Sequence, residues 1–314
     1  FYKFRKIIKI INIYDKPNER KKHKFPVPLV GGILVFLNIF FLILFSKTLE
    51  IDLEIISKNS FIFGYISFFL IGFYDDKYNI KAGTKLILSI MILIPILYLD
   101  KNLIVSVLKF SFSTSDFSLG IFDILVTILF FLLFINAFNM FDGINCQNGI
   151  YSVILVLVLL LIKNNSIFLY GLLFCLIFFN YLNFRNKLFL GDSGSLSLGF
   201  LFSYFFIYYY NNNLIQFSDS IYLYMYLPGL ELMRLYILRL INKSNPFKPD
   251  RNHIHHYFLK SYGYNKTILI IFVMIIFPII INFYFDNKTL QINILTLLFY
   301  LYFVVFKFRN NYNT

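Results

Sequence analysis

The sequence predicts an all-α protein, a polytopic transmembrane helix bundle of about ten helices, on the basis of three observations. First, 59% of the 314 residues are hydrophobic and 14% are charged, whereas a soluble globular domain carries roughly 25% charged residues. Second, the apolar residues gather in long runs that are separated by polar connections. Third, most basic residues lie in every second connection. We interpret residues 1–314 as a single integral membrane domain.

Ten apolar runs come close to the length of about 20 residues that a helix needs to cross the hydrocarbon core. They comprise residues 28–46, 57–74, 86–99, 121–138, 149–162, 166–182, 195–210, 219–235, 267–284 and 290–306. The third run is short, so we expect it to be tilted, kinked at Pro95 or extended at its ends. Because the chain begins at Phe1 without a complete apolar run, we expect that an eleventh, N-terminal helix is missing from this sequence.

The distribution of Lys and Arg predicts how the bundle is oriented, because cytoplasmic loops carry an excess of both. One set of alternate connections carries 23 of these residues and the opposite set carries 6. The richer set comprises residues 1–27, 75–85, 139–148, 183–194, 234–266 and 307–314. We therefore expect this set to face the cytoplasm. A basic face of this kind favours anionic lipid headgroups and anionic substrates, and no nucleic-acid partner is needed to explain the net charge of +13.

Other classes of protein receive little support. Two cysteines, Cys146 and Cys175, predict neither a disulfide framework nor a thiolate metal cluster. A transporter is disfavoured because the chain shows no internal repeat and no paired charges in the middle of a run. Glu231 is the one carboxylate placed deep within a run.

Adjacent carboxylates, Asp75 and Asp76, stand at the predicted cytoplasmic end of the second run. Neighbouring negative charges repel each other, so a cation or a basic group has to compensate them at a membrane boundary. Mg²⁺ suits this position, because it is commonly held by one or two carboxylates and substrate phosphates. The alternative is a solvated helix end with Lys77 as the counter-ion.

The segment NAFNMFDGIN places polar side chains at the end of the fourth run. Asn136, Asn139 and Asp142 are three residues apart, so on a helix they would share one face. Unpaired amides are costly at this depth, which favours a ligand or a packed polar network over hydrogen bonding between helices. We expect Gly143 to end the helix.

In the segment FLGDSGS, Asp192 and Ser193 are expected to cap the helix that follows. Gly191 and Gly194 would let the backbone approach an anion or a metal. An ordinary helix N-cap without a ligand is the alternative.

Three of the four histidines lie within the segment PFKPDRNHIHH, beside Arg251. Imidazole and guanidinium groups bind phosphates. A zinc site and a solvated loop remain the alternatives, although no nearby cysteine supports zinc. A further basic segment, residues 15–32, is interpreted as a membrane-surface anchor. All these segments lie on the predicted cytoplasmic face, which together suggests phosphate chemistry on a lipid.

These segments, in this order, resemble the polyprenyl-phosphate N-acetylhexosamine-1-phosphate transferases, which form glycosyltransferase family 4. The resemblance covers residues 15 to about 260 and rests on DKPNERKKHKFPVPLVGG, GFYDDK, NAFNMFDG, KLFLGDSGS and PFKPDRNHIHH. The HIHH form is similar to the N-acetylglucosaminyl branch that uses undecaprenyl phosphate. The muramoyl-pentapeptide branch carries three consecutive histidines before a Glu and is disfavoured.

The resemblance implies transfer of N-acetylglucosamine-1-phosphate, or a related N-acetylhexosamine-1-phosphate, from a UDP-sugar to undecaprenyl phosphate. This reaction releases UMP and starts a lipid-linked cell-envelope glycan, such as lipopolysaccharide, at the cytoplasmic face of a bacterial inner membrane. The implied partners are the polyprenyl phosphate, the UDP-N-acetylhexosamine and membrane lipids, and a homodimer is left open. The alternatives are a phospho-N-acetylmuramoyl-pentapeptide transferase and an inactive membrane scaffold homologue.

The resemblance also implies roles for single residues. Asp192 is expected to bind Mg²⁺, for which Mn²⁺ could substitute, together with Asp75 and Asp76. Asp75, Asp76 and Asp142 form the implied catalytic group. The implied substrate-binding residues are Asn136, Asn139, Lys85, Arg251, His253, His255 and His256.

The chain departs from the family pattern at three positions. Asn145 stands where the family often has a second Asp, Ser89 stands where a Gln is common, and Glu231 stands where an Asp is usual. A carboxylate role therefore cannot be carried over to Asn145.

Overall fold

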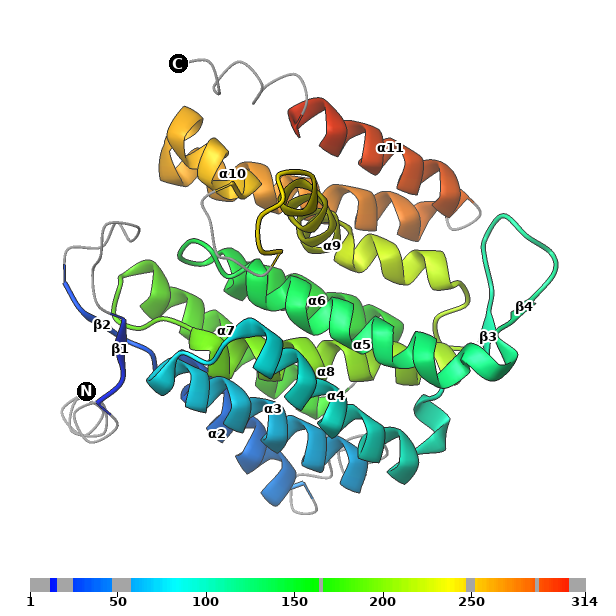
Figure 1. Ribbon diagram of the computed structural model, residues 1–314, viewed down its shortest axis with the longest axis horizontal. Helices are drawn as coiled ribbons and strands as arrows, with labels where there is room; N and C mark the ends of the chain where they lie inside the picture. The colour runs from blue at the N-terminus through cyan, green and yellow to red at the C-terminus, as the bar shows by residue number, and fades with distance from the viewer. Residues whose placement is uncertain are drawn as a thin grey trace.

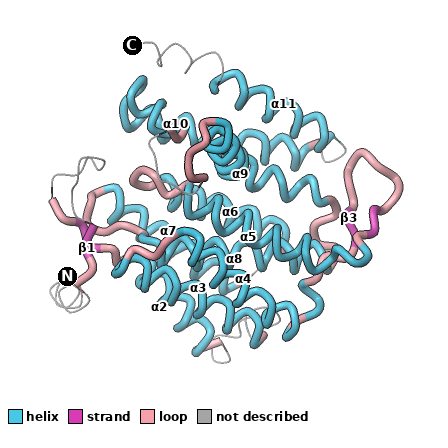
Figure 2. Tube along the Cα trace, in the orientation of Figure 1, coloured by secondary structure: helices cyan, strands magenta, loops and turns pink. Residues whose placement is uncertain are grey.

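Each of the ten predicted apolar runs forms one α-helix in the computed structural model, which describes residues 12–15, 25–46, 58–163, 166–246, 252–285 and 288–304. The all-α prediction is thus confirmed (Figure 1, Figure 2). The helices in these residues are α2 (Gly31–Leu44), α3 (Asn59–Tyr78), α4 (Ala82–Leu99), α5 (Asp123–Met140), α6 (Gln147–Ile162), α7 (Ile167–Phe184), α8 (Gly191–Asn211), α9 (Ser218–Ile241), α10 (Ile254–Tyr284) and α11 (Thr289–Tyr302).

Short elements lie at the two ends of the helical bundle. The antiparallel pair β1 (Tyr14–Asp15) and β2 (Val27–Pro28) lies at the left end in Figure 1, and the pair β3 (Val107–Leu108) and β4 (Phe117–Ser118) lies at the right end. Two 3-10 turns, η1 (Lys101–Leu103) and η2 (Gly120–Phe122), flank the second pair.

Helices α4 and α10 differ from their predicted runs. Helix α4 begins at Ala82, four residues before the predicted run, and continues through Pro95, so the short run is extended at its start. In α10, Gly263 has a φ of 74° and a ψ of 175°, which breaks the helix into two parts. Only the second part matches the predicted run, and the first carries the histidine segment.

Helix α8 is the centre of the bundle. All its residues from Ser193 to Tyr210 are buried, and the ring of Phe200 stacks on Phe68 and Phe131 from α3 and α5. Helix α3 approaches α8 closely at Gly72, where a Cβ atom would overlap with the backbone of Asp192. Small residues permit such close helix contacts in membrane proteins.

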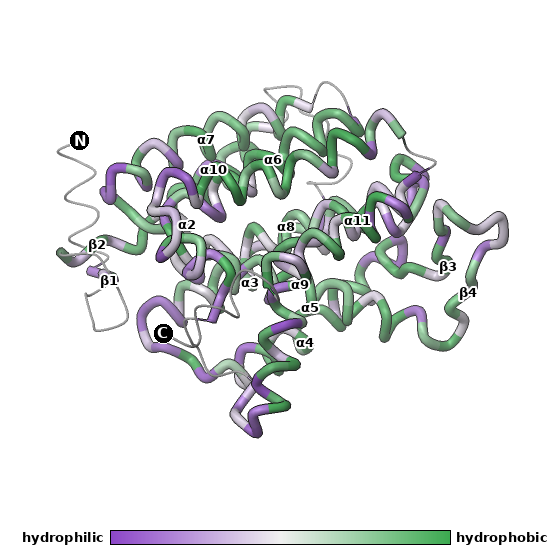
Figure 3. Tube along the Cα trace, turned by 90° about the horizontal axis from the view of Figure 1, so that it is seen from above, coloured by the Kyte–Doolittle hydropathy of each residue, from purple (hydrophilic) through white to green (hydrophobic). Residues whose placement is uncertain are grey.

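The outer surface of the bundle is apolar, as expected of a multi-pass membrane protein. Large hydrophobic side chains point outward from several helices, for example Met91, Phe174 and Phe277, and Figure 3 shows hydrophobic residues along most of α6 and α7. Among the described residues, four helical segments are long and apolar enough to cross a membrane: Ala82–Leu99, Gly120–Met140, Ile167–Phe184 and Ile254–Tyr284. The other six helices remain predicted spans.

The connections alternate between the two ends of the bundle. At one end, the N–H of Gly31 donates to the carbonyl of Phe189 at 2.9 Å, which joins the start of α2 to the segment before α8. At the opposite end, Asp100 accepts hydrogen bonds from Lys58 at 2.9 Å and from Tyr204 at 3.2 Å, joining the start of α3, the end of α4 and the far part of α8. We call the first end, which carries the predicted site residues, the motif end.

The close approach of α3 to α8 makes Gly72 a test of the fold. We expect Gly72→Ala to lower the free energy of unfolding by about 1–3 kcal/mol, because the added methyl group must push the two backbones apart. The melting temperature can be followed with a thiol-reactive dye, since Cys146 and Cys175 are both buried and react on unfolding. Gly83→Ala is the matched control, because its Cβ would meet no atom within 4 Å. Equal melting temperatures for the two variants would contradict the packing described here.

Candidate active site

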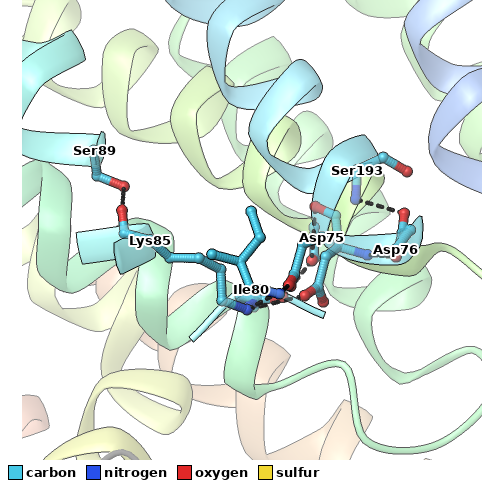
Figure 4. A network of polar contacts seen from close by, with 9 residues as sticks. Asp75, Asp76, Ile80, Lys85, Ser89 and Ser193 are labelled. Atoms are coloured by element: carbon cyan, nitrogen blue, oxygen red, sulfur yellow. Dashed lines mark hydrogen bonds and ion pairs between the residues drawn. The ribbon is translucent and has the colours of Figure 1, made fainter. Parts of the chain in front are cut away.

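Carboxylates from two helices meet at Lys85. Asp75 lies in the last turn of α3, and Asp192 lies in the first turn of α8. The Lys85 Nζ atom donates to Asp75 Oδ2 at 2.6 Å (Figure 4). It also donates to Asp192 Oδ2 at 3.1 Å. Both ion pairs are partly shielded from solvent, since the Lys85 side chain is 19% exposed. One ammonium group thus compensates two carboxylates that are 117 positions apart in the chain, by the difference of their residue numbers.

A tight turn after α3 produces this arrangement. Asn79 ends the helix in the left-handed conformation, with a φ of 54°, which asparagine tolerates better than most residues. The turn lets the N–H of Ile80 donate to Asp75 Oδ1 at 2.5 Å. The turn also reverses the chain direction between α3 and α4, so that Lys85 in the first turn of α4 faces Asp75. The counter-ion of Asp75 is therefore Lys85, whereas Lys77 was the counter-ion considered from the sequence.

Asp76 caps the N-terminus of α8. Its Oδ1 accepts the N–H of Asp192 at 2.7 Å, and its Oδ2 accepts the N–H of Ser193 at 3.0 Å. The N-terminal N–H groups of a helix lack intrahelical partners and attract negative charge. The prediction that Asp192 and Ser193 cap α8 is wrong, because the N-cap residue is Leu190 and a carboxylate from α3 supplies the acceptor. This geometry favours a positioning role for Asp76, and its direct metal ligation stays a prediction.

The polar stripe of α5 is shorter than expected. The helix ends at Met140, so Asn136 and Asn139 share a helical face and Asp142 lies in the loop beyond it. Asn139 accepts a hydrogen bond of 2.5 Å from the Ser195 hydroxyl, which ties α5 to α8. The Asp142 side chain is exposed and lines the cavity at the motif end. The protein atoms around this position, together with the charge on Asp76, raise the pKa of Asp142 above its ordinary value.

The histidines form a stacked group at the start of α10. The ring centroids of His255 and His256 are 4.4 Å apart, and those of His253 and His255 are 5.0 Å apart. His255 is buried, and its Nδ1 lies 3.3 Å from the side-chain nitrogen of Gln147. A Cβ atom at Gly143 would overlap with the His255 ring. Gly143 therefore makes room for this ring, and the prediction that it ends α5 is wrong.

Glu231 holds the segment that precedes the histidine helix. Arg234 donates to both of its carboxylate oxygens at 3.0 Å, and the Tyr300 hydroxyl also donates to it. The N–H of Ile254 donates to Glu231 Oε2 at 2.9 Å, and Arg234 donates to the carbonyl of Asn252 at 2.5 Å. This buried ion pair thus fixes where α10 begins.

All predicted site residues that the structure describes line one cavity of about 2400 Å³ at the motif end. These are Asp75, Asp76, Lys85, Asn136, Asn139, Asp142, Asp192, His253, His255 and His256. Arg251 lies outside the described residues. Carboxylates suited to a hard cation thus face the same space as basic groups suited to phosphates.

Three residues that contact the site residues were not identified from the sequence. Arg234 follows Glu231 by three positions, and this spacing on a helix was a usable signal. Gln147 and Tyr300 contact the site from distant parts of the chain, so no local pattern indicates them.

Comparisons with known proteins agree with this site. The sequence profile described as "Glycosyl transferase family 4" matches residues 59–210. An undecaprenyl-phosphate alpha-N-acetylglucosaminyl 1-phosphate transferase of Thermotoga maritima is 30% identical over 263 residues, which are 82% of this chain and 76% of that protein. Proteins of the same name from Salmonella typhi and Escherichia coli strain K12 are each 28% identical, over 82% of this chain and 72% of their own length.

The capping role of Asp76 can be tested by substitution. In Asp76→Asn, the side-chain amide retains one acceptor oxygen and turns an NH₂ group toward a backbone N–H of α8. We expect the free energy of unfolding to fall by about 1–2 kcal/mol, the typical cost of a lost helix cap, and the thiol-dye melting temperature to fall with it. Asp116→Asn, in the exposed loop between β3 and β4, is the control. An unchanged melting temperature in Asp76→Asn would show that the cap contributes nothing.

The Glu231–Arg234 pair allows a double-variant test. Glu231→Gln leaves the largely buried Arg234 guanidinium without its counter-ion, and we expect destabilisation of about 3 kcal/mol or more. The variant Glu231→Gln/Arg234→Gln should lose less stability than the sum of the two single variants, because it leaves no unpaired buried charge. Thermal unfolding of the three variants measures this coupling, and strictly additive losses would argue against it.

Proposed function

This chain belongs to glycosyl transferase family 4, and we propose that it transfers N-acetylglucosamine-1-phosphate from a UDP-sugar to a polyprenyl phosphate. The products of this transfer are the polyprenyl diphosphate-linked sugar and UMP. We place the reaction at the cytoplasmic face of a bacterial inner membrane, because 23 of the 29 Lys and Arg residues belong to the connections predicted to face the cytoplasm.

The observation that carries this proposal is a single cavity with two kinds of wall. Its polar wall holds the carboxylates, Lys85 and the histidines. Its apolar wall includes Leu129 and Leu133 of α5 and Met233 and Ile237 of α9, which are all well exposed. A polyprenyl chain could therefore stay in the lipid while its phosphate reaches the polar wall. The volume of about 2400 Å³ exceeds the roughly 300–1,000 Å³ of ordinary small-molecule sites, which suits two large substrates.

The residues at the polar wall fit a magnesium ion, for which Mn²⁺ could substitute. No group of three or more His, Cys, Asp or Glu side chains forms a metal cluster within the described ranges. Mg²⁺ needs fewer protein ligands, since one or two carboxylates, substrate phosphates and water complete its shell. Asp75 and Asp192 already share one cation, the Lys85 ammonium. Asp76 supports this pair by holding the backbone of Asp192.

The chemistry is an in-line displacement at the phosphorus atom that carries the sugar. An oxygen of the polyprenyl phosphate forms the new P–O bond, and the bond from this phosphorus to the bridging oxygen breaks, so that UMP leaves. A bound Mg²⁺ would neutralise the diphosphate and stabilise the leaving group. A phosphate monoester is largely ionised near neutral pH, so positioning matters more here than proton removal. The histidine group at the start of α10 supplies donors for the phosphates or the sugar.

Asp142 suits a site that receives a diphosphate. Because its pKa is raised, this carboxyl group accepts a proton more readily than an ordinary aspartate. A protonated carboxyl can donate a hydrogen bond to a phosphate or a sugar hydroxyl without electrostatic repulsion. We include Asp142 with Asp75 and Asp76 in the proposed catalytic group.

A transfer assay tests the proposal directly. We expect purified protein to move label from radiolabelled UDP-N-acetylglucosamine to undecaprenyl phosphate when Mg²⁺ or Mn²⁺ is present. Asp192→Asn should reduce this transfer by about 100-fold or more, because it removes a carboxylate proposed to bind the metal that neutralises the reacting phosphates. Asp116→Asn, in an exposed loop at the opposite end of the bundle, serves as the control and should transfer at the wild-type rate.

Other donors separate the remaining alternatives. Transfer from a different UDP-N-acetylhexosamine would keep the reaction class and change the specificity. Transfer only from a UDP-muramoyl-pentapeptide would favour the phospho-N-acetylmuramoyl-pentapeptide reaction. Folded protein that transfers from none of these donors would contradict the enzyme and favour an inactive scaffold.

A further inference from the structure

Lys85 occupies the position between the two carboxylates that a metal ion would need. Asp75 Oδ1 already accepts the N–H of Ile80, and Asp75 Oδ2 accepts the Lys85 ammonium. The same ammonium reaches Asp192 Oδ2, on a different helix. The oxygens that face each other across the site are thus joined by a protein cation.

A divalent metal that binds through Asp75 Oδ2 and Asp192 Oδ2 competes with the ammonium for the same two oxygens. Mg²⁺ binds oxygen ligands at about 2.0–2.1 Å in near-octahedral geometry, so it would lie between the oxygens that the ammonium now joins at 2.6 and 3.1 Å. The two positive charges would also repel each other at such close range. Metal binding through these two oxygens therefore favours departure of the Lys85 ammonium.

Lys85 is well placed for such a movement. Its charge sits on a flexible four-carbon stem, its side chain lines the cavity, and it stands in the first turn of α4, so only side-chain torsions have to change. Without a cation, Asp75 and Asp192 could both be ionised at the boundary of α3 and α8 only at a cost in mutual repulsion. An internal ammonium keeps them paired before the metal arrives.

We infer that Lys85 acts as a resident cation that holds Asp75 and Asp192 together until a divalent metal displaces its ammonium into the substrate cavity. The inference rests on the proposed function, which supplies the metal. It assigns Lys85 a role in the metal-free protein, in addition to the substrate-binding role that the family resemblance implies. Its direct consequence is that Lys85 competes with the metal.

Metal binding in the absence of substrates tests this competition. Free Mn²⁺, measured by its electron paramagnetic resonance signal, gives the affinity of the purified protein in detergent. We expect Lys85→Met to bind Mn²⁺ at least five-fold more tightly than the wild type, and Lys85→Arg to stay within two-fold of it. Lys77→Met is the matched control, because Lys77 lines the same cavity and stacks on Tyr78. This control removes the same charge without freeing the two carboxylates, and Asp192→Asn should abolish the binding.

Equal or weaker Mn²⁺ binding by folded Lys85→Met would overturn the inference. If Lys85→Met binds Mn²⁺ no more tightly than Lys77→Met, the inference is also overturned, because any gain in affinity over the wild type would then reflect net charge alone. The transfer activity of the wild type is measured separately. If the wild type transfers sugar phosphate but Lys85→Met binds Mn²⁺ no more tightly than the wild type, only the inference is refuted. If the wild type neither transfers sugar phosphate nor binds Mn²⁺, the proposed function and the inference both fail.

A measurement on the wild-type protein keeps the test independent of variant folding. Reductive methylation followed by mass spectrometry gives the reactivity of the Lys85 amine, with Lys77 as the internal reference. Displacement by Mg²⁺ should raise Lys85 methylation at least three-fold and leave Lys77 methylation unchanged. Unchanged or reduced Lys85 methylation at saturating Mg²⁺ would show that the ammonium stays between the carboxylates.

Discussion

The junction between the end of α3 and the start of α8 supports the rest of the site. Asp76 accepts the first free N–H groups of α8, and Gly72 lets the two backbones meet. Because α8 is buried along almost its whole length, its starting point determines where Asp192 stands relative to Asp75. A carboxylate that caps a neighbouring helix thus positions the carboxylate proposed to bind metal, at a point where the helix dipole favours negative charge.

A second anchor positions the basic side of the cavity. Glu231 and Arg234 of α9 hold the backbone just before α10, and Gly143 leaves space for the His255 ring. The loop that carries Asp142 therefore packs directly on the histidine group. Both anchors give a carboxylate its hydrogen-bond partners: Asp76 accepts two backbone N–H groups of α8, and Glu231 pairs with Arg234. An unpaired charge near the lipid would cost far more than such a pair contributes. The two sides of the cavity are consequently built on helix ends, which suits the proposed transfer, because that reaction depends on the relative placement of two phosphates.

The sequence predicted the helices well because their length and apolar character reflect the thickness of a bilayer, which acts on each segment separately. It also indicated which polar segments face the cavity, because clusters of polar groups at the ends of apolar runs on one face suggest a function, and the family resemblance supplied the roles of single residues. The expectations that failed concerned local detail. The stripe from Asn136 to Asp142 assumed that α5 continues beyond Met140, where it ends. Asp192 and Ser193 were expected to cap α8 because both residue types are common caps, but Asp76 from another helix takes this role.

By itself, the sequence determined the fold class, the approximate positions of the apolar helices in the described part of the chain and the set of polar segments that share one end of the bundle. These follow from composition, run length and charge distribution, which are properties of neighbouring residues. Only the tertiary structure decided that Lys85 bridges Asp75 and Asp192, that Asp76 caps α8 and that Gln147 and Tyr300 support the site. Each of these contacts joins residues from separate helices, and the choice among many possible carboxylate and amide partners is made by helix packing, which no local pattern records.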